Sequence, residues 1–217
     1  MDKIVNCQKT LKDDFQEILS NRRSVREFQS KPVEEEKLFR VLDAGLKAPS
    51  HNHLREWEFL LIKDFGQRGK VVELGVKAED VTNPEKLEKA TEGMEAELQR
   101  EMYLRALPVQ KRMLLSSPEL VAVCFRMRKP LKDCKSLYDL NCLASVWTCI
   151  ENILLAMAAE GLHGVTYVPY ETASLKKVLN MPEDYEVAAL IPIGYAKDYS
   201  VKQITVSLKE KIHINEW

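Results

Sequence analysis

Residues 136–161, SLYDLNCLASVWTCIENILLAMAAEG, carry the strongest core signal in the chain. Apolar side chains recur every three or four residues, at Leu140, Leu143, Trp147, Ile150, Leu154 and Met157. This spacing predicts a helix. Further apolar residues at positions 155, 156, 158 and 159 widen the stripe, so we expect the helix to be buried on nearly all sides. Gly161 is expected to end it.

Shorter signals extend outward from this central helix. Short apolar, β-branched runs predict strands at 57–62, 120–125, 164–168 and 187–193. Amphipathic patterns predict helices at 10–21, 32–47, 64–77 and 172–179, the last capped by Thr172. The order has no regular βαβ repeat and no visible linker. We therefore predict one α+β domain over residues 1–217, with a single central mixed or antiparallel sheet flanked by helices.

Residues 83–107 have a different composition from the rest. Glu, Lys, Gln and Arg dominate, and apolar residues are few. Such a helix is either largely solvated or a mobile cover over another surface. We treat 83–111 as a lid or insertion.

Composition excludes several classes of protein. The chain has 217 residues, of which 45% are hydrophobic and 30% charged, with a net charge of −1. This balance argues against general nucleic-acid binding. The first eight residues lack the apolar run of a signal peptide, and we expect no stretch as long as a membrane span, so a cytoplasmic protein is predicted. Five cysteines without a C-x-x-C pair favour neither a disulfide framework nor a zinc site.

The segment Arg22-Arg23-Ser24-Val25-Arg26-Glu27-Phe28 is the best candidate for a binding site. If it is extended, Arg22, Ser24 and Arg26 point the same way, with Phe28 next on that face. Two guanidinium groups and a hydroxyl suit a cluster of phosphate oxygens. By composition alone, a solvated basic turn is the alternative.

Familiar catalytic and phosphate-binding motifs are missing from the sequence. There is no G-x-G-x-x-G, no G-x-x-x-x-G-K-[ST], no G-x-S-x-G and no H-E-x-x-H. His51 and His53 lack nearby cysteine or acid partners for zinc, so surface loop histidines are the simple interpretation. Any anionic ligand must therefore be held by side chains.

Four blocks, in order, resemble the nitroreductase family of FMN-dependent NAD(P)H oxidoreductases. The first is the basic segment, similar to the family's R-R-S-x-R-x-F opening. The second is Ala48-Pro49-Ser50 with His53 and Trp57-Glu58-Phe59, and the third is residues 152–162 with Val165-Thr166-Tyr167-Val168-Pro169. The fourth is Leu190-Ile191-Pro192-Ile193-Gly194-Tyr195. A closing basic pair in the tail, Lys209-Glu210-Lys211, follows these blocks. The chain looks most similar to the iodotyrosine-deiodinase-like branch.

The resemblance implies a homodimer with FMN at its interface and a domain-swapped tail, residues 200–217, that reaches the partner subunit. It also implies a set of cofactor-binding residues and no catalytic side chain. From one subunit these are Arg22, Arg23, Ser24, Arg26 and Arg112, with Pro169, Tyr170 and Glu171 along one flavin face, and Lys209 and Lys211 reach the same phosphate from the tail. From the other subunit they are Pro49, Ser50, His51 and His53.

The implied function is hydride transfer from NADH or NADPH, through flavin N5, to a nitroaromatic, a quinone or a similar small acceptor in a ping-pong cycle. Two alternatives remain open: a flavin-binding sensor or carrier without turnover, and a specialised chemistry such as reductive dehalogenation.

The sequence departs from the family pattern in places. Arg55-Glu56 precedes Trp57 where the family usually has proline, and Val109 or Gln110 falls where many members carry a flavin-contacting asparagine. The deiodinase branch holds its amino-acid substrate with a Glu, a Tyr and a Lys. Here Glu97, Tyr103 and Lys111 lack that branch's spacing, so deiodination is not supported.

Overall fold

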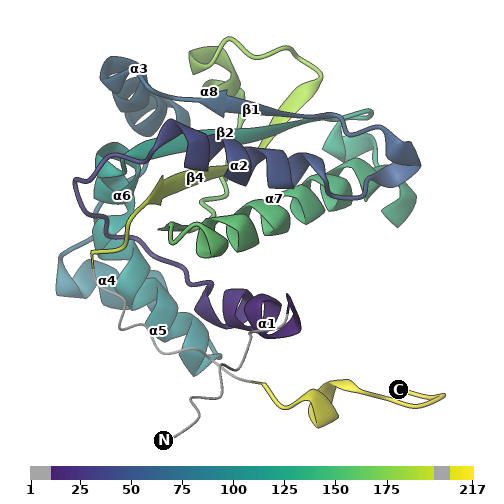
Figure 1. The fold of residues 1–217 in the computed structure, drawn as a ribbon. Helices are drawn as coiled ribbons and strands as arrows, with labels where there is room; N and C mark the ends of the chain where they lie inside the picture. Colours follow the sequence, from purple (N-terminus) through teal and green to yellow (C-terminus); the bar gives the residue numbers. More distant parts are fainter. Residues whose placement is uncertain (1–10, 198–205) are drawn as a thin grey trace, which may run out of the picture.

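A four-stranded antiparallel sheet forms the centre of the molecule (Figure 1). The computed structural model describes residues 11–197 and 206–217. The sheet has the order β1-β2-β4-β3, and each neighbouring pair is antiparallel. Its strands are β1 (Trp57–Leu61), β2 (Glu119–Arg126), β3 (His163–Gly164) and β4 (Tyr185–Gly194). This confirms the predicted single sheet.

Helices cover both faces of the sheet, which confirms the α+β class. In Figure 1, α2 and α7 lie on one face and α3 and α8 on the other. The helices are α1 (Leu11–Asn21), α2 (Glu35–Leu46), α3 (Phe65–Lys70), α4 (Pro84–Thr91), α5 (Glu97–Ala106), α6 (Gln110–Ser116), α7 (Asn141–Ala159) and α8 (Ala173–Val178). A π-helical turn, Val71–Val76, continues α3, and short 3-10 turns occupy His51–His53, Leu107–Val109, Leu131–Asp133, Leu137–Leu140 and Leu208–Lys211.

Strand β2 separates two hydrophobic cores. Because successive side chains on a strand point to opposite faces, its residues divide evenly. Val121, Val123 and Phe125 join the core made with α2 and α7. Leu120, Ala122 and Cys124 join the core made with α6, α8 and the π-helical turn. An apolar run with both faces buried explains why this strand lies inside the sheet.

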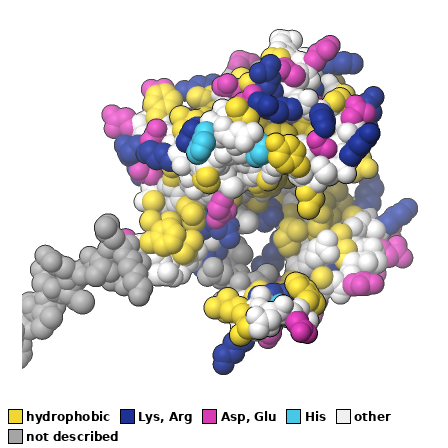
Figure 2. All heavy atoms as spheres, turned by 90° about the vertical axis from the view of Figure 1, so that its right-hand side faces the viewer, with side chains coloured by type: hydrophobic (Ala, Val, Ile, Leu, Met, Phe, Trp, Pro, Cys, Tyr) yellow, Lys and Arg dark blue, Asp and Glu magenta, His cyan; other side chains and the backbone are white. Residues whose placement is uncertain are grey.

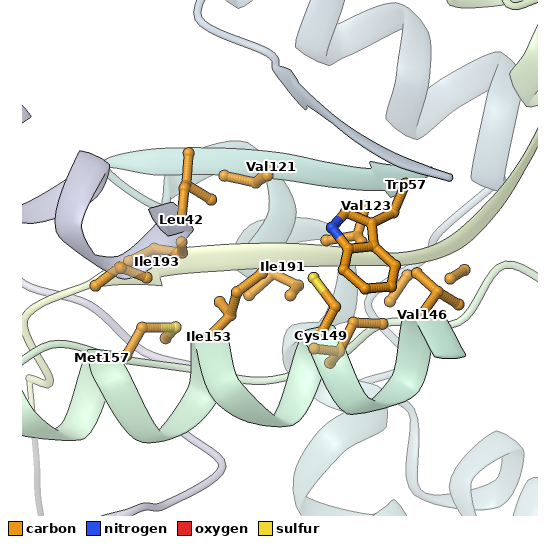
Figure 3. Packing of buried hydrophobic residues seen from close by; sticks show 14 of the residues in the cluster. Leu42, Trp57, Val121, Val123, Val146, Cys149, Ile153, Met157, Ile191 and Ile193 are labelled. Carbon is orange, nitrogen blue, oxygen red and sulfur yellow. The ribbon is translucent and has the colours of Figure 1, made fainter. Parts of the chain in front are cut away.

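The long helix α7 packs by a stripe that shares Ile150 and Met157 with the one its spacing predicted and differs at the other positions. Its buried residues are Val146, Cys149, Ile150, Ile153 and Met157. Figure 3 shows several of them pointing toward β2 and β4. Trp147 stays 36% exposed, so the expectation of burial on nearly all sides is wrong for a single chain. Apolar residues surround much of this helix, and periodicity alone cannot tell which side meets the sheet.

The range 137–159 also corrects the expectation about membrane spans. By length and composition alone it is long and apolar enough to cross a membrane. Its buried residues pack on the sheet, however, which is the arrangement of a core helix in a soluble protein. Of its most apolar 18-residue stretch, 28% is buried in the single chain.

The charged region 83–107 is two helices, not one. Gly93, with φ 75°, lies between α4 and α5 and has the left-handed backbone that glycine adopts easily at a helix end. Only Thr91 of α4 and Ala106 of α5 are buried. The prediction of a solvated region is confirmed, while the prediction of a continuous helix is wrong.

Candidate functional site

The basic segment runs extended along the edge of the sheet. Ser24 forms a parallel bridge with Gly164, and the backbone N–H of Val25 donates to the Gly164 carbonyl at 3.0 Å. Phe28 forms an antiparallel bridge with Ala196. Val25 is buried, and Phe28 packs into the core on the α8 side of the sheet. Phe28 is thus a packing residue, not an extension of the arginine face.

Arg26 is the most distinctive residue of this segment. Its Nη2 lies 3.5 Å from the Sδ of Met102 on α5. Burial lowers the pKa of its guanidinium. Within residues 11–197 and 206–217 it has no carboxylate partner. A half-buried cation without a counter-charge is costly, and a bound anion would relieve that cost.

Arg22 and Arg23 lie beside the C-terminal half of α7. With Leu154, Met157 and His163 they border a small gap. The Arg23 guanidinium donates to the carbonyl oxygens of Ser20 and Arg22. His163 is not among the predicted site residues, and its only signal in the sequence is its place directly before the predicted strand at 164. Burial, together with the charge of Arg23, lowers the His163 pKa, which favours a neutral imidazole.

Arg112 approaches the same segment from α6. Its Nη2 lies 3.5 Å from Glu27 Oε1. The Asp80 carboxylate accepts hydrogen bonds from the backbone N–H groups of Lys111, at 2.8 Å, and Arg112, at 3.3 Å, and so fixes the start of the helix. The structure therefore brings Arg112 close to the basic segment.

Residues 49–53 attach to the other end of α7. Thr148 Oγ1 donates to the Pro49 carbonyl at 2.9 Å, and the His51 N–H donates to Ser145 Oγ at 2.9 Å. Asn52 and His53 have φ angles of 52° and 56°. Left-handed backbone is uncommon for residues other than glycine and tends to cluster at functional sites.

Within one chain, this loop and the basic segment lie far apart. The loop contacts α7 at Ser145, whereas Arg22 borders it at Met157. At 1.5 Å per residue, these two positions are about 18 Å apart along the helix. Figure 2 looks onto the loop's end of the molecule, where histidine, Lys and Arg side chains gather. One chain therefore presents two separate halves of the predicted site.

Of residues 169–171, Pro169 is buried, and Glu171 makes its contacts with the start of α8. Tyr170 is fully exposed, and the Glu171 carboxylate accepts from the N–H groups of Ala173 and Ser174 at the start of α8. Thr172 occupies the predicted N-cap position of α8, but its hydroxyl donates to Glu186 and not to the helix backbone. Desolvation raises the Glu171 pKa, but the two N–H donors outweigh it and hold the pKa below its ordinary value.

The tail lysines do not meet Arg26 within one chain. Lys209 and Lys211 lie in a 3-10 turn, and residues 206–217 are all exposed. Figure 1 draws this turn away from the sheet. Leu208, Ile214 and Trp217, which are 72%, 80% and 102% exposed, leave apolar surface uncovered on the tail. Residues 200–205 of the predicted tail lie outside the described residues.

In the part of the chain that the structure describes, no group of three or more His, Cys, Asp and Glu side chains could hold a metal ion. The polar side chains gathered at the basic segment are several cations, one hydroxyl and one carboxylate, Glu27, which pairs with Arg112, so the net charge is positive. Their chemistry suits an anionic organic ligand.

Known proteins share this architecture. A crystal structure of oxidized iodotyrosine deiodinase bound to FMN and 3-iodo-L-tyrosine aligns with a TM-score of 0.73 and 22% identity, covering 94% of this chain and 99% of that one. The NADPH:FMN oxidoreductase of Vibrio harveyi complexed with NAD+ aligns with a TM-score of 0.67 and 17% identity, covering 94% and 78%.

Sequence comparison agrees with the structural one. An iodotyrosine deiodinase of Thermotoga neapolitana is 23% identical over 182 residues, which is 84% of this chain and 88% of that protein. The family model described as "Nitroreductase family" matches residues 19–195. That match spans well over half of the 217 residues, and it includes the basic segment and the sheet. The chain therefore belongs to the nitroreductase family.

Proposed function

We propose that this protein is an FMN-dependent oxidoreductase that transfers hydride from NADH or NADPH to a nitroaromatic, a quinone or a similar small acceptor by a ping-pong mechanism. The observation that carries this proposal is Arg26, a half-buried cation without a carboxylate partner among the described residues. Arg22 and Ser24 lie close to Arg26 along the chain, and Arg112 contacts Glu27 of the same segment at 3.5 Å.

These residues fit the phosphate end of FMN. Each charge-assisted hydrogen bond from Arg22, Ser24 or Arg26 to a phosphate oxygen would contribute about 1.5–3 kcal/mol. The buried Val25 and its bond to Gly164 hold the segment in place, so little ordering is required on binding. When bound, the flavin supplies the hydride-transfer chemistry, and no side-chain nucleophile is required.

The separation of the two half-sites supports a homodimer. One chain's Pro49–His53 loop lies too far along α7 to line a cofactor held by its own Arg22 and Arg26. An antiparallel pairing of two copies along α7 would bring the loop of one chain to the basic segment of the other. The half-buried apolar side chains of α7, with Trp147 at 36% exposure, supply a surface for that pairing.

The tail and the region 83–111 fit the same arrangement. An exposed tail carrying Leu208, Ile214 and Trp217 would bury its apolar groups on a second copy and take Lys209 and Lys211 to that copy's phosphate site. Met102 of α5 lies against Arg26, so α5 borders the cofactor segment as a lid would.

The test begins with the purified protein. We expect about one FMN per chain, a dimeric mass, and steady oxidation of NADH or NADPH with a quinone acceptor. Parallel double-reciprocal plots would support the ping-pong order. Bound flavin without turnover would favour a sensor or carrier, and a colourless protein that does not take up FMN would refute the proposal.

Reductive dehalogenation is a second candidate because several relatives are named iodotyrosine deiodinase. Against it, Lys111 lies 2.6 Å from Glu73 and would have to leave this ion pair to hold an amino-acid carboxylate. Release of iodide from iodotyrosine by the dithionite-reduced protein would favour this candidate. Failure to release iodide, together with quinone turnover, would favour the first.

A further inference from the structure

A cavity of about 180 Å³ lies between the loop 50–57 and the start of α7. Three aromatic side chains border it: His51, Trp57 and Tyr138. The rings of His51 and Tyr138 meet edge to face, with centroids 5.1 Å apart. A dry apolar cavity of about 150 Å³ is enough to hold benzene, so this one has room for a single ring with a small substituent.

Most of the charges around the cavity neutralise one another. Arg128 forms a two-point pair with Glu56, with both N–O distances at 3.1 Å. Lys129 pairs with Asp139. These two pairs leave this part of the wall close to neutral.

Arg55 is the exception among the charged residues at the cavity. Within the described ranges it forms no ion pair, and its guanidinium reaches only the carbonyl of His53, at 3.4 Å. Its φ angle of 47° is left-handed, so the loop holds the residue in an uncommon conformation. The amide of Asn141, which also lines the cavity, has no hydrogen-bond partner within the described ranges.

We propose that this cavity binds a small molecule made of one aromatic ring with an anionic substituent, of the benzoate class. The ring packs among His51, Trp57 and Tyr138, and the anion pairs with Arg55, with Asn141 as an additional donor. The position of this ligand beside a cofactor of the partner subunit rests on the proposed function, since it depends on the loop reaching that subunit. The binding site itself does not.

Calorimetric titration of the full chain with two matched probes tests the charge preference. We expect 4-nitrobenzoate to bind about tenfold more tightly than nitrobenzene, as one charge-assisted contact allows. Arg55→Gln should remove most of this tenfold preference while changing nitrobenzene affinity less than twofold. Lys132→Gln, which removes an exposed cation that is not part of the cavity lining, should preserve the preference. If Arg55→Gln and Lys132→Gln prefer 4-nitrobenzoate over nitrobenzene to the same extent, Arg55 does not bind the anion.

Two cysteines supply a matched test of the cavity itself. Cys142 lines the cavity and Cys134 does not, although both are partly exposed and both approach a nearby carbonyl. Cys142→Leu fills the space and should weaken both probes at least tenfold, whereas Cys134→Leu should not. If Cys142→Leu fails to fold, Tyr138→Ala is the second variant. It removes one aromatic wall of the cavity at a residue that is 66% exposed, and it should weaken the binding of both probes. Unchanged binding in a folded cavity variant would refute the site.

The two proposals can fail separately. A protein that holds FMN and turns over, but shows neither the charge preference nor the cysteine difference, would refute only the aromatic site. A protein that shows the binding pattern but neither takes up FMN nor oxidises NAD(P)H would refute only the proposed function.

Discussion

The guanidinium of Arg26 lies 3.5 Å from the thioether sulfur of Met102, 76 residues further along the chain. This contact joins the basic segment to α5, the second helix of the charged region 83–111. Because the sulfur is a weak acceptor, it leaves the charge of Arg26 uncompensated. Arg26 thus contacts the candidate lid and still has a positive charge that a bound anion could neutralise.

Arg26→Ala should release most of the FMN while the protein stays folded. The loss of one or two charge-assisted bonds, each about 1.5–3 kcal/mol, predicts roughly 10- to 100-fold weaker binding or more. The measurement is the ratio of flavin to protein absorbance after gel filtration. Arg100→Ala, on the exposed surface of α5, is the control and should retain the flavin. Equal flavin content in both variants would remove Arg26 from the site.

His53→Ala should impair a cofactor site that is completed by the neighbouring subunit. Mixed dimers test this directly. A dimer of one Arg26→Ala chain with one His53→Ala chain should contain one intact site and recover about half of the wild-type activity. A dimer of a wild-type chain with a chain carrying both substitutions should contain none. If instead the first dimer is inactive and the second keeps about half of the activity, the two half-sites lie within one chain and do not meet across subunits.

Trp147→Glu should separate the subunits. Trp147 is 36% exposed on the apolar side of α7, and a charge there would have to be desolvated on pairing. Light scattering should report a monomer that has also lost flavin. Phe65→Glu, a 72% exposed aromatic on the other face of the sheet, should stay dimeric. A dimeric Trp147→Glu variant would place the interface elsewhere.

Gly164→Ala should destabilise the fold and weaken flavin binding together. A Cβ at Gly164 would overlap the Pro192 carbonyl, which is backbone and cannot easily move. Overpacking of this kind costs about 1–3 kcal/mol, and the shift would reach Ser24 and Val25, which pair with Gly164. Gly69→Ala, in the open on α3, should instead stabilise by up to about 1 kcal/mol. Urea unfolding measures both.

Glu34 should contribute to stability at neutral pH and lose its contribution in acid. The Tyr195 hydroxyl donates to Glu34 at 2.5 Å and, with other contacts, lowers the Glu34 pKa from 4.5 to about 2. A depressed pKa in the folded state means that the contribution is complete above pH 4.5 and declines as the pH falls toward 2. Because Glu34 is exposed, the effect should be small.

The measurement for Glu34 is the melting temperature across this pH range. Glu34→Gln should lower the melting temperature at pH 7 and flatten its decline in acid, whereas Glu88→Gln, an exposed control, should follow the wild-type curve. If the melting temperature of Glu34→Gln falls with pH as steeply as that of the wild type, other groups cause the acid dependence.

By itself the sequence determined the kinds of elements and the family. Local periodicity places helices and strands because neighbouring side chains along the chain decide which residues share a face, and this identified β2 and the burial of Leu38, Val41 and Leu42 on α2. The ordered motifs identified the family because each requires specific residues at close spacing.

Only the tertiary structure decided which face of α7 meets the sheet and where the half-sites lie. Apolar residues surround much of this helix, so its periodicity is compatible with several packed faces, and the partners on β2 and β4 selected the one containing Val146, Cys149 and Ile153. The contact of Arg26 with Met102, and the separation of His51 from Arg22 along α7, join residues distant in sequence. Such relationships depend on how packed elements are positioned in space, which local patterns do not encode.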